Sequence, residues 1–101
     1  MSSPLSRVLI TGGTRGIGFA TAEHFAARGS EVLLNYHRDD VQAEQARAAL
    51  TSSDAVARVL RADVGDAASV DQMFDTLDGL ELNVLIVNAA DEGRSLVAFD
   101  K

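Results

Sequence analysis

The chain has 101 residues, of which 47% are hydrophobic and 24% charged, a composition typical of one globular domain rather than a disordered, fibrous or membrane-embedded chain. Its formal net charge of -6 argues against nucleic acid and anionic membranes as partners, because both attract basic surfaces. The sequence has no cysteine, which excludes disulfides, thiolate catalysis and cysteine-based metal sites. Neither a signal peptide nor a membrane anchor is indicated near the N-terminus, so we expect a cytoplasmic protein.

Strands and helices are predicted to alternate from residue 8 to residue 88. Strands are expected at residues 8–10, 31–36, within 55–62 and at 82–88, because these are short apolar runs with β-branched residues. Helices are expected from near residue 15 to the stop signal at 29–30, over 40–50 with Asp39 or Asp40 as the cap, and from a cap at Asp66 through residue 77. Right-handed crossovers would join four strands into one doubly wound parallel sheet, an α/β architecture.

The sequence also predicts one buried face on each of two helices and one open edge of the sheet. Apolar residues at helical spacing are expected to be buried, namely Ile17, Ala20 and Phe25 in the first helix and Val70, Met73, Phe74 and Leu77 in the third. After residue 88 we expect a loop with a helical turn, which leaves the outer edge of the fourth strand without a partner. An open edge invites association, so we expect the isolated chain to be marginally stable or to self-associate through that edge.

A glycine-rich turn, residues 11–18, follows the first predicted strand directly and opens the first helix. This order places backbone N–H groups and the positive end of a helix dipole where a pyrophosphate can bind. A nucleoside-triphosphatase phosphate loop is excluded, because Phe19 and Ala20 follow Gly18 where Lys and Ser or Thr are required. A turn without a ligand and a methyltransferase-type loop stay open as alternatives, although the latter favours an acidic residue where this chain has Asn35 and Tyr36.

The motif Thr11-Gly12-x-x-x-Gly16-Ile17-Gly18 resembles the cofactor signature of the short-chain dehydrogenases/reductases, a family of NAD(P)-dependent oxidoreductases with a Rossmann fold. Ala62-Asp63-Val64 resembles the family's Asp-Val pair, whose carboxylate accepts a hydrogen bond from the adenine amino group. Val87-Asn88-Ala89-Ala90 is similar to the family's Asn-Asn-Ala-Gly segment, which supports the sheet and lines the adenosine ribose, but it departs from that segment at Val87 and Ala90. The resemblance covers residues 7–90 and implies an incomplete Rossmann-type sheet.

The motif glycines have separate predicted duties. Gly12 permits the tight turn, Gly16 lets the backbone approach the pyrophosphate, and Gly18 allows the helix to pack close to the sheet. Replacement of Gly16 by valine is therefore expected to abolish dinucleotide binding in a chain that still folds. The residues predicted to bind the cofactor are Gly12, Thr14, Arg15, Gly16, Ile17, Gly18, Tyr36, Arg38, Asp63, Val64, Asn88, Ala89 and Ala90.

The residues around the second strand end favour NADP(H) as the cofactor. In Rossmann sites an acidic residue there binds the ribose 2′-hydroxyl of NAD and repels a 2′-phosphate. Tyr36 stands at the matching position, with Arg38 close behind it. Arg15 precedes the second motif glycine, where the resemblance associates a basic residue with NADP, and guanidinium groups bind phosphate well. NAD is the less favoured alternative, kept open by the acidic residues at 39 and 40.

The sequence predicts no catalytic residue and no metal ligand. Family reductases transfer a hydride to a carbonyl while a Tyr supplies the proton, with a Lys four residues later and a Ser that orients the carbonyl. This chain has one tyrosine, Tyr36, and one lysine, Lys101, so no such pair is present, and Ser95 lies too near the fourth strand. We interpret residues 1–101 as a single truncated domain, the cofactor-binding half of a carbonyl or alcohol oxidoreductase. A non-catalytic nucleotide-binding or interaction module that needs a partner and a defective gene product are the alternatives.

Overall fold

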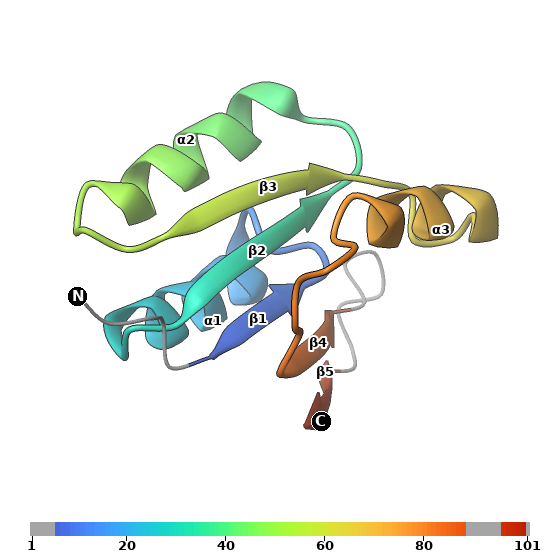
Figure 1. Cartoon of the computed structure of the whole chain (residues 1–101). Coiled ribbons are helices and arrows are strands. Elements are labelled where there is room, and N and C mark those ends of the chain that lie inside the picture. The colour runs from blue at the N-terminus through green and yellow to red at the C-terminus, as the bar shows by residue number, and fades with distance from the viewer. Residues whose placement is uncertain (1–5, 89–95, 101) are drawn as a thin grey trace.

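Four parallel strands and one antiparallel strand form a sheet in the order β3-β2-β1-β4-β5 (Figure 1). The computed structural model describes residues 6–88 and 96–100. The strands are β1 (Arg7–Ile10), β2 (Glu31–Tyr36), β3 (Ala57–Arg61), β4 (Val84–Asn88) and β5 (Leu96–Asp100). The predicted doubly wound α/β sheet of four parallel strands, of the Rossmann type, is thus confirmed.

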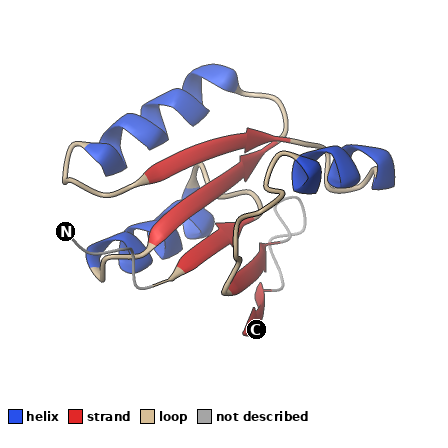
Figure 2. Ribbon diagram, viewed as in Figure 1, coloured by secondary structure: helices blue, strands red, loops and turns tan. Residues whose placement is uncertain are grey.

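Three helices connect the parallel strands (Figure 2), namely α1 (Gly16–Ala27), α2 (Asp40–Thr51) and α3 (Ala67–Asp75). The two predicted aspartate caps are present: Asp39 accepts a hydrogen bond from the Gln42 amide, and Asp66 accepts one from the Ala68 amide. Within the described ranges, no helix is long and apolar enough to cross a bilayer.

The core lies on both faces of the two central strands. Val8 and Ile10 of β1 pack with Ala22 of α1 and with α2 on one face of the sheet. Leu9, which points the opposite way, packs with Met73 of α3 on the other face. A parallel strand that is covered on both faces has a nearly continuous apolar sequence. The strands predicted at residues 8–10 and 31–36 are confirmed for this reason. This packing fixes the carboxyl ends of β1 and β2 side by side.

The two predicted helix stripes are partly wrong. Ile17 is 63% exposed and Phe74 is 40% exposed, although Met73 and Leu77 are buried as expected. Helix α1 instead buries Gly18 and Ala22, because small side chains let it approach its neighbours closely. Helix α3 ends at Asp75, two residues before Leu77, and β4 begins at Val84 rather than at residue 82.

The predicted open edge of the fourth strand is also wrong. Strand β5 pairs antiparallel with β4 along its whole length, from Val84 opposite Asp100 to Asn88 opposite Leu96. Residues 96–99 form an apolar run with β propensity, which is the signal that the prediction of a loop and a helical turn overlooked. Because β5 pairs with the backbone groups of this edge, the expected route of self-association through an open β4 edge is absent from the described structure, and self-association itself stays a prediction.

Candidate functional site

The candidate site lies where the carboxyl ends of the parallel strands meet (Figure 1). Strand β1 has β2 and β3 on one side and β4 on the other, so the strand order reverses beside β1. In open α/β sheets ligands bind outside the carboxyl ends of the strands at such a reversal. The glycine-rich turn between β1 and α1 lies at this point, as the sequence predicts.

The first half of the turn is bound to the two neighbouring strands. The Thr11 amide donates to the carbonyl oxygen of Ile86 in β4 at 3.0 Å. The Gly12 amide donates to Oδ1 of Asn35 at 3.3 Å, and the Gly13 amide donates to the backbone oxygen of Asn35 at 3.0 Å. These three N–H groups are therefore engaged by the protein and are not available to a ligand.

The second half of the turn keeps its donors available. Within the described part of the chain, the amides of residues 14–18 make no hydrogen bond, and the first amide bonded back into the helix is that of Phe19, to Arg15 at 3.2 Å. The N-cap residue Arg15 makes no side-chain cap bond, and the first turn of α1 holds no acidic residue. A helix N-terminus with unsatisfied amides and a positive dipole end suits an anion such as a phosphate.

Backbone geometry explains why the motif needs its glycines. Gly12 and Gly16 have φ angles of 61° and 60°, a region that other residues adopt only with strain. A Cβ on Gly18 would lie 2.2 Å from the carbonyl oxygen of Gly12, so a side chain there would displace the turn. Gly18 thus brings α1 close to the turn itself, whereas the space beside Gly16 is open. Of the other motif residues, Thr14 is half-buried, and Arg15 and Ile17 are exposed.

A small ionic network occupies the ends of β2 and β3. The Tyr36 hydroxyl donates to Oδ1 of Asp40 at 2.7 Å. That hydrogen bond, followed by burial and by the negative charge of Asp40, raises the pKa of Tyr36, and Arg61 opposes the shift. Arg61 lies 3.5 Å from Oδ2 of Asp40 and donates to the backbone oxygen of His37 at 3.2 Å. Arg38 is exposed, and the described residues offer it no ion-pair partner.

The loop after β3 presents the predicted carboxylate. Oδ1 of Asp63 accepts a hydrogen bond from the Gly65 amide at 2.9 Å, while its Oδ2 lies 3.7 Å from Nε2 of His37. The Asp63 amide donates to Oγ of Ser69 at 2.8 Å, which ties the loop to α3. The Asp63 side chain is 47% exposed and Val64 is 53% exposed, so both face outward at this edge.

The end of β4 is joined to the glycine-rich turn. The Asn88 amide donates to Oγ1 of Thr11 at 2.8 Å, and Nδ2 of Asn88 donates to the carbonyl oxygen of Gly12 at 3.4 Å. The structure therefore brings the predicted residue Asn88 against the turn. The two remaining predicted residues, Ala89 and Ala90, lie outside the described residues.

Sequence reasoning missed two residues at this edge. In the sequence, Asn35 is notable only because it is not acidic. In the structure it is 3% exposed and contacts the turn. Arg61 lies within the predicted third strand but has no predicted role at the site, yet it faces Tyr36 across the β2–β3 pair. A signal existed for Asn35, since a single polar residue follows the apolar run 32–34 inside a buried strand.

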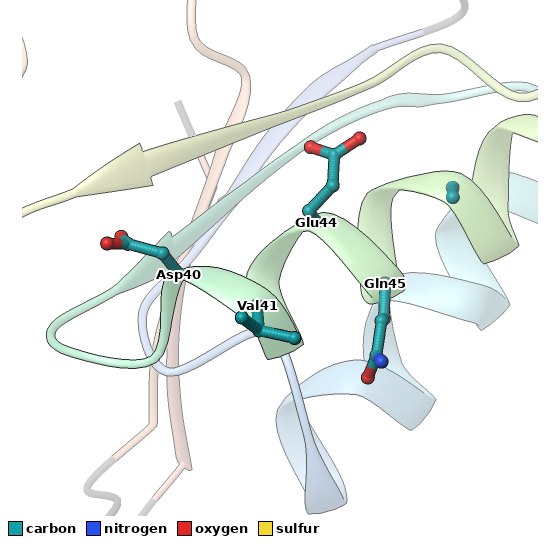
Figure 3. Close-up of a pocket in the computed structure, with 5 residues that line it drawn as sticks. Asp40, Val41, Glu44 and Gln45 are labelled. Atoms are coloured by element: carbon teal, nitrogen blue, oxygen red, sulfur yellow. The ribbon is translucent and has the colours of Figure 1, made fainter.

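Neither a hollow on α2 nor any cluster of possible metal ligands offers a second candidate site among the described residues. The hollow is lined by Asp40, Val41, Glu44, Gln45 and Ala48 (Figure 3). All five belong to one helix, and the labelled side chains of Asp40, Glu44 and Gln45 point in different directions, so no polar groups converge there. Among the described residues, no group of three or more His, Cys, Asp or Glu side chains is placed to hold a metal ion.

The fold and this edge define the NAD(P)-binding Rossmann region of an oxidoreductase. The chain belongs to the short-chain dehydrogenase family, whose model matches residues 6–99.

Individual relatives agree with this assignment. The chain is 39% identical over 83 residues to 3-oxoacyl-[acyl-carrier-protein] reductase of Synechocystis sp., a match that covers 80% of this chain and 34% of the relative. It is 33% identical over 95 residues to NADPH-dependent aldehyde reductase 2, chloroplastic, of Arabidopsis thaliana, covering 81% and 35%. The solved structure of a dehydrogenase/reductase from Sinorhizobium meliloti 1021 superposes with a TM-score of 0.76 at 31% identity, covering 85% and 35%. The chain spans about a third of the length of these proteins.

Proposed function

We propose that this chain binds NADP(H) at the carboxyl edge of its sheet, with the diphosphate on the amides of residues 14–18. The proposal rests on one observation. The amides of residues 11–13 are hydrogen-bonded to the neighbouring strands, whereas the amides of residues 14–18 make no hydrogen bond with the described residues. The exposed side chain of Ile17 lies beside those donors, where a ligand would cover it. The ligand-free turn and the methyltransferase-type loop are less favoured, because the chain belongs to a family of oxidoreductases.

The proposed site follows the edge of the sheet. Asp63 and Val64 would form the adenine side, with one carboxylate oxygen of Asp63 held by the Gly65 amide and the other facing His37. Asn88 would support the ribose side from the end of β4. The proposed cofactor-binding residues remain Gly12, Thr14, Arg15, Gly16, Ile17, Gly18, Tyr36, Arg38, Asp63, Val64, Asn88, Ala89 and Ala90.

The preference for NADP over NAD is supported by the state of the acidic residues near Tyr36. Asp39 caps α2 through its side chain, and Asp40 is engaged by the Tyr36 hydroxyl and by Arg61. Both carboxylates are thus held by internal partners. Arg15 and Arg38, by contrast, make no ion pair with the described residues, so their exposed guanidinium groups are available to a 2′-phosphate. The printed name of the Arabidopsis relative, an NADPH-dependent reductase, points the same way.

A comparison of cofactors with matched arginine variants tests this preference. We expect wild-type chain to bind NADPH at least about tenfold more tightly than NADH in calorimetric titrations. Arg15→Ala is expected to reduce that ratio by weakening NADPH alone. Arg28→Ala, which removes an exposed arginine bonded to His24 at the far end of α1, is the control and should leave both affinities unchanged. Equal affinities of the wild type for NADPH and NADH would overturn the preference.

For the whole protein we propose carbonyl reduction, in which bound NADPH would supply the hydride, or the reverse alcohol oxidation, in which bound NADP⁺ would accept it. Within these 101 residues the proposed role is cofactor binding. A proton donor for this chemistry needs a pKa lowered toward neutrality, whereas the hydrogen bond to Asp40 raises the pKa of Tyr36. The same observation favours the second candidate, a nucleotide-binding module without turnover. Assays of NADPH oxidation with a panel of ketones and aldehydes should therefore show binding without turnover, and steady oxidation by the chain would contradict this assignment.

A further inference from the structure

Asn35 has an unusual environment for a polar residue in a parallel strand. It is 3% exposed and lies at the carboxyl end of β2, between β1 and β3. Its Oδ1 accepts a hydrogen bond from the Gly12 amide at 3.3 Å. Its Nδ2 lies 3.1 Å from the carbonyl oxygen of Ala62 and 3.3 Å from that of Leu60. A buried amide costs free energy unless it is hydrogen-bonded, and here its acceptor has a partner in the turn after β1 and its donor has partners at the end of β3.

The contact with Gly12 fixes the peptide on which the rest of the turn depends. The Gly12 amide is held by Asn35 of β2, and the Gly12 carbonyl oxygen is held by Nδ2 of Asn88 of β4 at 3.4 Å. The same carbonyl oxygen is the atom that a Cβ on Gly18 would meet at 2.2 Å. The two peptide groups that flank the Gly12 Cα, one held through its N–H and the other through its C=O, therefore determine where the first turn of α1 can begin. The available amides of residues 14–18 lie between these two glycines.

The contact with Ala62 acts on the other side of the proposed site. Ala62 is buried and directly precedes Asp63, the predicted adenine-binding carboxylate. Its amide donates to the backbone oxygen of Tyr36 at 2.9 Å, and its carbonyl oxygen accepts from Asn35. One side chain thus connects the diphosphate turn to the start of the Asp63 loop.

We infer that Asn35 is a positioning residue for dinucleotide binding, which holds the diphosphate turn and the Asp63 loop in a fixed relation. The inference rests on the proposed function, and it assigns to Asn35 no contact with the cofactor. An aliphatic side chain of similar size would fill the same space and lose both connections. The Gly13 amide would keep its bond, because its acceptor is the backbone oxygen of residue 35.

The test compares Asn35→Leu with Leu33→Ala in the full chain. Leu33 lies two residues earlier on the same strand, is fully buried and packs toward α3, so its truncation lowers stability without touching the turn. NADPH affinity is measured by calorimetry at a temperature where circular dichroism shows each variant folded. Amide hydrogen exchange of Gly12 and Gly13 is followed by nuclear magnetic resonance without ligand. Should Asn35→Leu not fold, Asn35→Asp takes its place, since it keeps an acceptor for Gly12 and removes the amide donor to Ala62.

The expected result for Asn35→Leu is a loss of NADPH affinity of about tenfold or more, with Gly12 losing exchange protection and Gly13 keeping it. Leu33→Ala should bind NADPH within about twofold of wild type. For Asn35→Asp, weakened NADPH binding with Gly12 still protected supports the inference. Wild-type affinity in a folded Asn35 variant overturns it. Failure of the wild type to bind NADPH instead removes the proposed function, and the exchange data then still decide whether Asn35 holds Gly12.

Discussion

Among the side chains that the structure describes, the amino edge and the carboxyl edge of the sheet each bury two polar residues, but the contacts of these residues differ. At the amino edge Ser30 bonds to Ser6, and Glu31 lies between Arg7 and Arg58, so the buried polar groups pair with other side chains, although Oε2 of Glu31 has no hydrogen-bond partner among the described residues. At the carboxyl edge the buried residues are Thr11 and Asn35, and both bind backbone groups around the glycine-rich turn.

The buried polar groups of the amino edge therefore stabilise the fold, whereas those of the carboxyl edge position the backbone of the glycine-rich turn. The amino edge pairs its buried carboxylate with two arginine side chains, so its polar groups contribute to stability. Thr11 and Asn35 hold the turn in place while the amides of residues 14–18 keep their donors available. A site for an anion needs donors that the fold positions and does not consume. Variants at the two edges should therefore separate stability from cofactor binding.

The largest effect is expected for Gly18→Ala at the carboxyl edge. Its Cβ would lie 2.2 Å from the Gly12 carbonyl oxygen, so the turn or α1 must move. We expect the free energy of unfolding to fall by about 3 kcal/mol or more, with loss of NADPH binding. Urea denaturation measures the first and calorimetry the second. Gly79→Ala is the control, because alanine would be strained at the φ of 86° but would meet no atom within 4 Å. It should lower the free energy of unfolding by about 1 to 2 kcal/mol.

At the amino edge, Glu31→Gln should lower stability and leave binding unchanged. Oε1 of Glu31 accepts from Arg7 Nε at 2.9 Å, and its Oε2 lies 3.4 Å from Arg58 Nε. Replacing one carboxylate oxygen by an amide group places donors against donors. We expect a loss of about 1 to 3 kcal/mol in urea denaturation, with the Kd for NADPH unaltered. A clear loss of NADPH affinity in this variant would break the distinction between the two edges.

Gly16→Ala should weaken NADPH binding strongly and lower stability only slightly, which is the opposite of the effect expected for Glu31→Gln. A Cβ at this position meets no other protein atom within 4 Å, so the cost to the fold is the strain of φ at 60°, about 1 kcal/mol. The new methyl group would stand where the backbone approaches the diphosphate, and NADPH affinity should fall at least about tenfold. Because a β-branched residue at positive φ is strained further, Gly16→Val should bind no better and fold less stably. Unchanged affinity in a folded Gly16→Ala chain would remove the proposed diphosphate position.

The smallest effect concerns the tyrosine at the carboxyl edge. Tyr36 is the single tyrosine of the chain, so tyrosinate absorbance reports its pKa directly. We expect a midpoint above the ordinary value of about 10 in the wild type and a lower one in Asp40→Asn, which removes the charge. Because folding raises this pKa, the stability it contributes is present below pH of about 10 and is lost as pH rises through the folded value. Identical midpoints in the two chains would contradict the network.

The sequence predicted what depends on local pattern and missed what depends on neighbours. The apolar run of β2 predicted its bounds, and the helix formers and Asp39 placed α2, because both signals lie within the element itself. The exposure of Ile17 could not be predicted from helical spacing, since α1 approaches its neighbours through Gly18 and Ala22. The pairing of β5 with β4 was missed because residues 96–100 were expected to be a loop with a helical turn, although the sequence also predicted an available edge beside β4.

The candidate site shows the same limit. The glycine motif located the turn, but the roles of Asn35 and Arg61 depend on bonds to residues more than twenty positions away in the chain. Asn35 is adjacent to Gly12 only because β2 and β1 pair in parallel. A polar residue in a buried strand signals that a partner exists, but the sequence alone does not say which one.

The proposed binding of the diphosphate by the amides of residues 14–18 can be tested by titrating the nitrogen-15-labelled chain with NADPH and following the amides by nuclear magnetic resonance. We expect the largest amide shifts on residues 14–18 as binding saturates, with the amide of Glu31 at the opposite edge unmoved. Saturable NADPH binding with its largest shifts elsewhere, for example along the exposed face of α2, would contradict it.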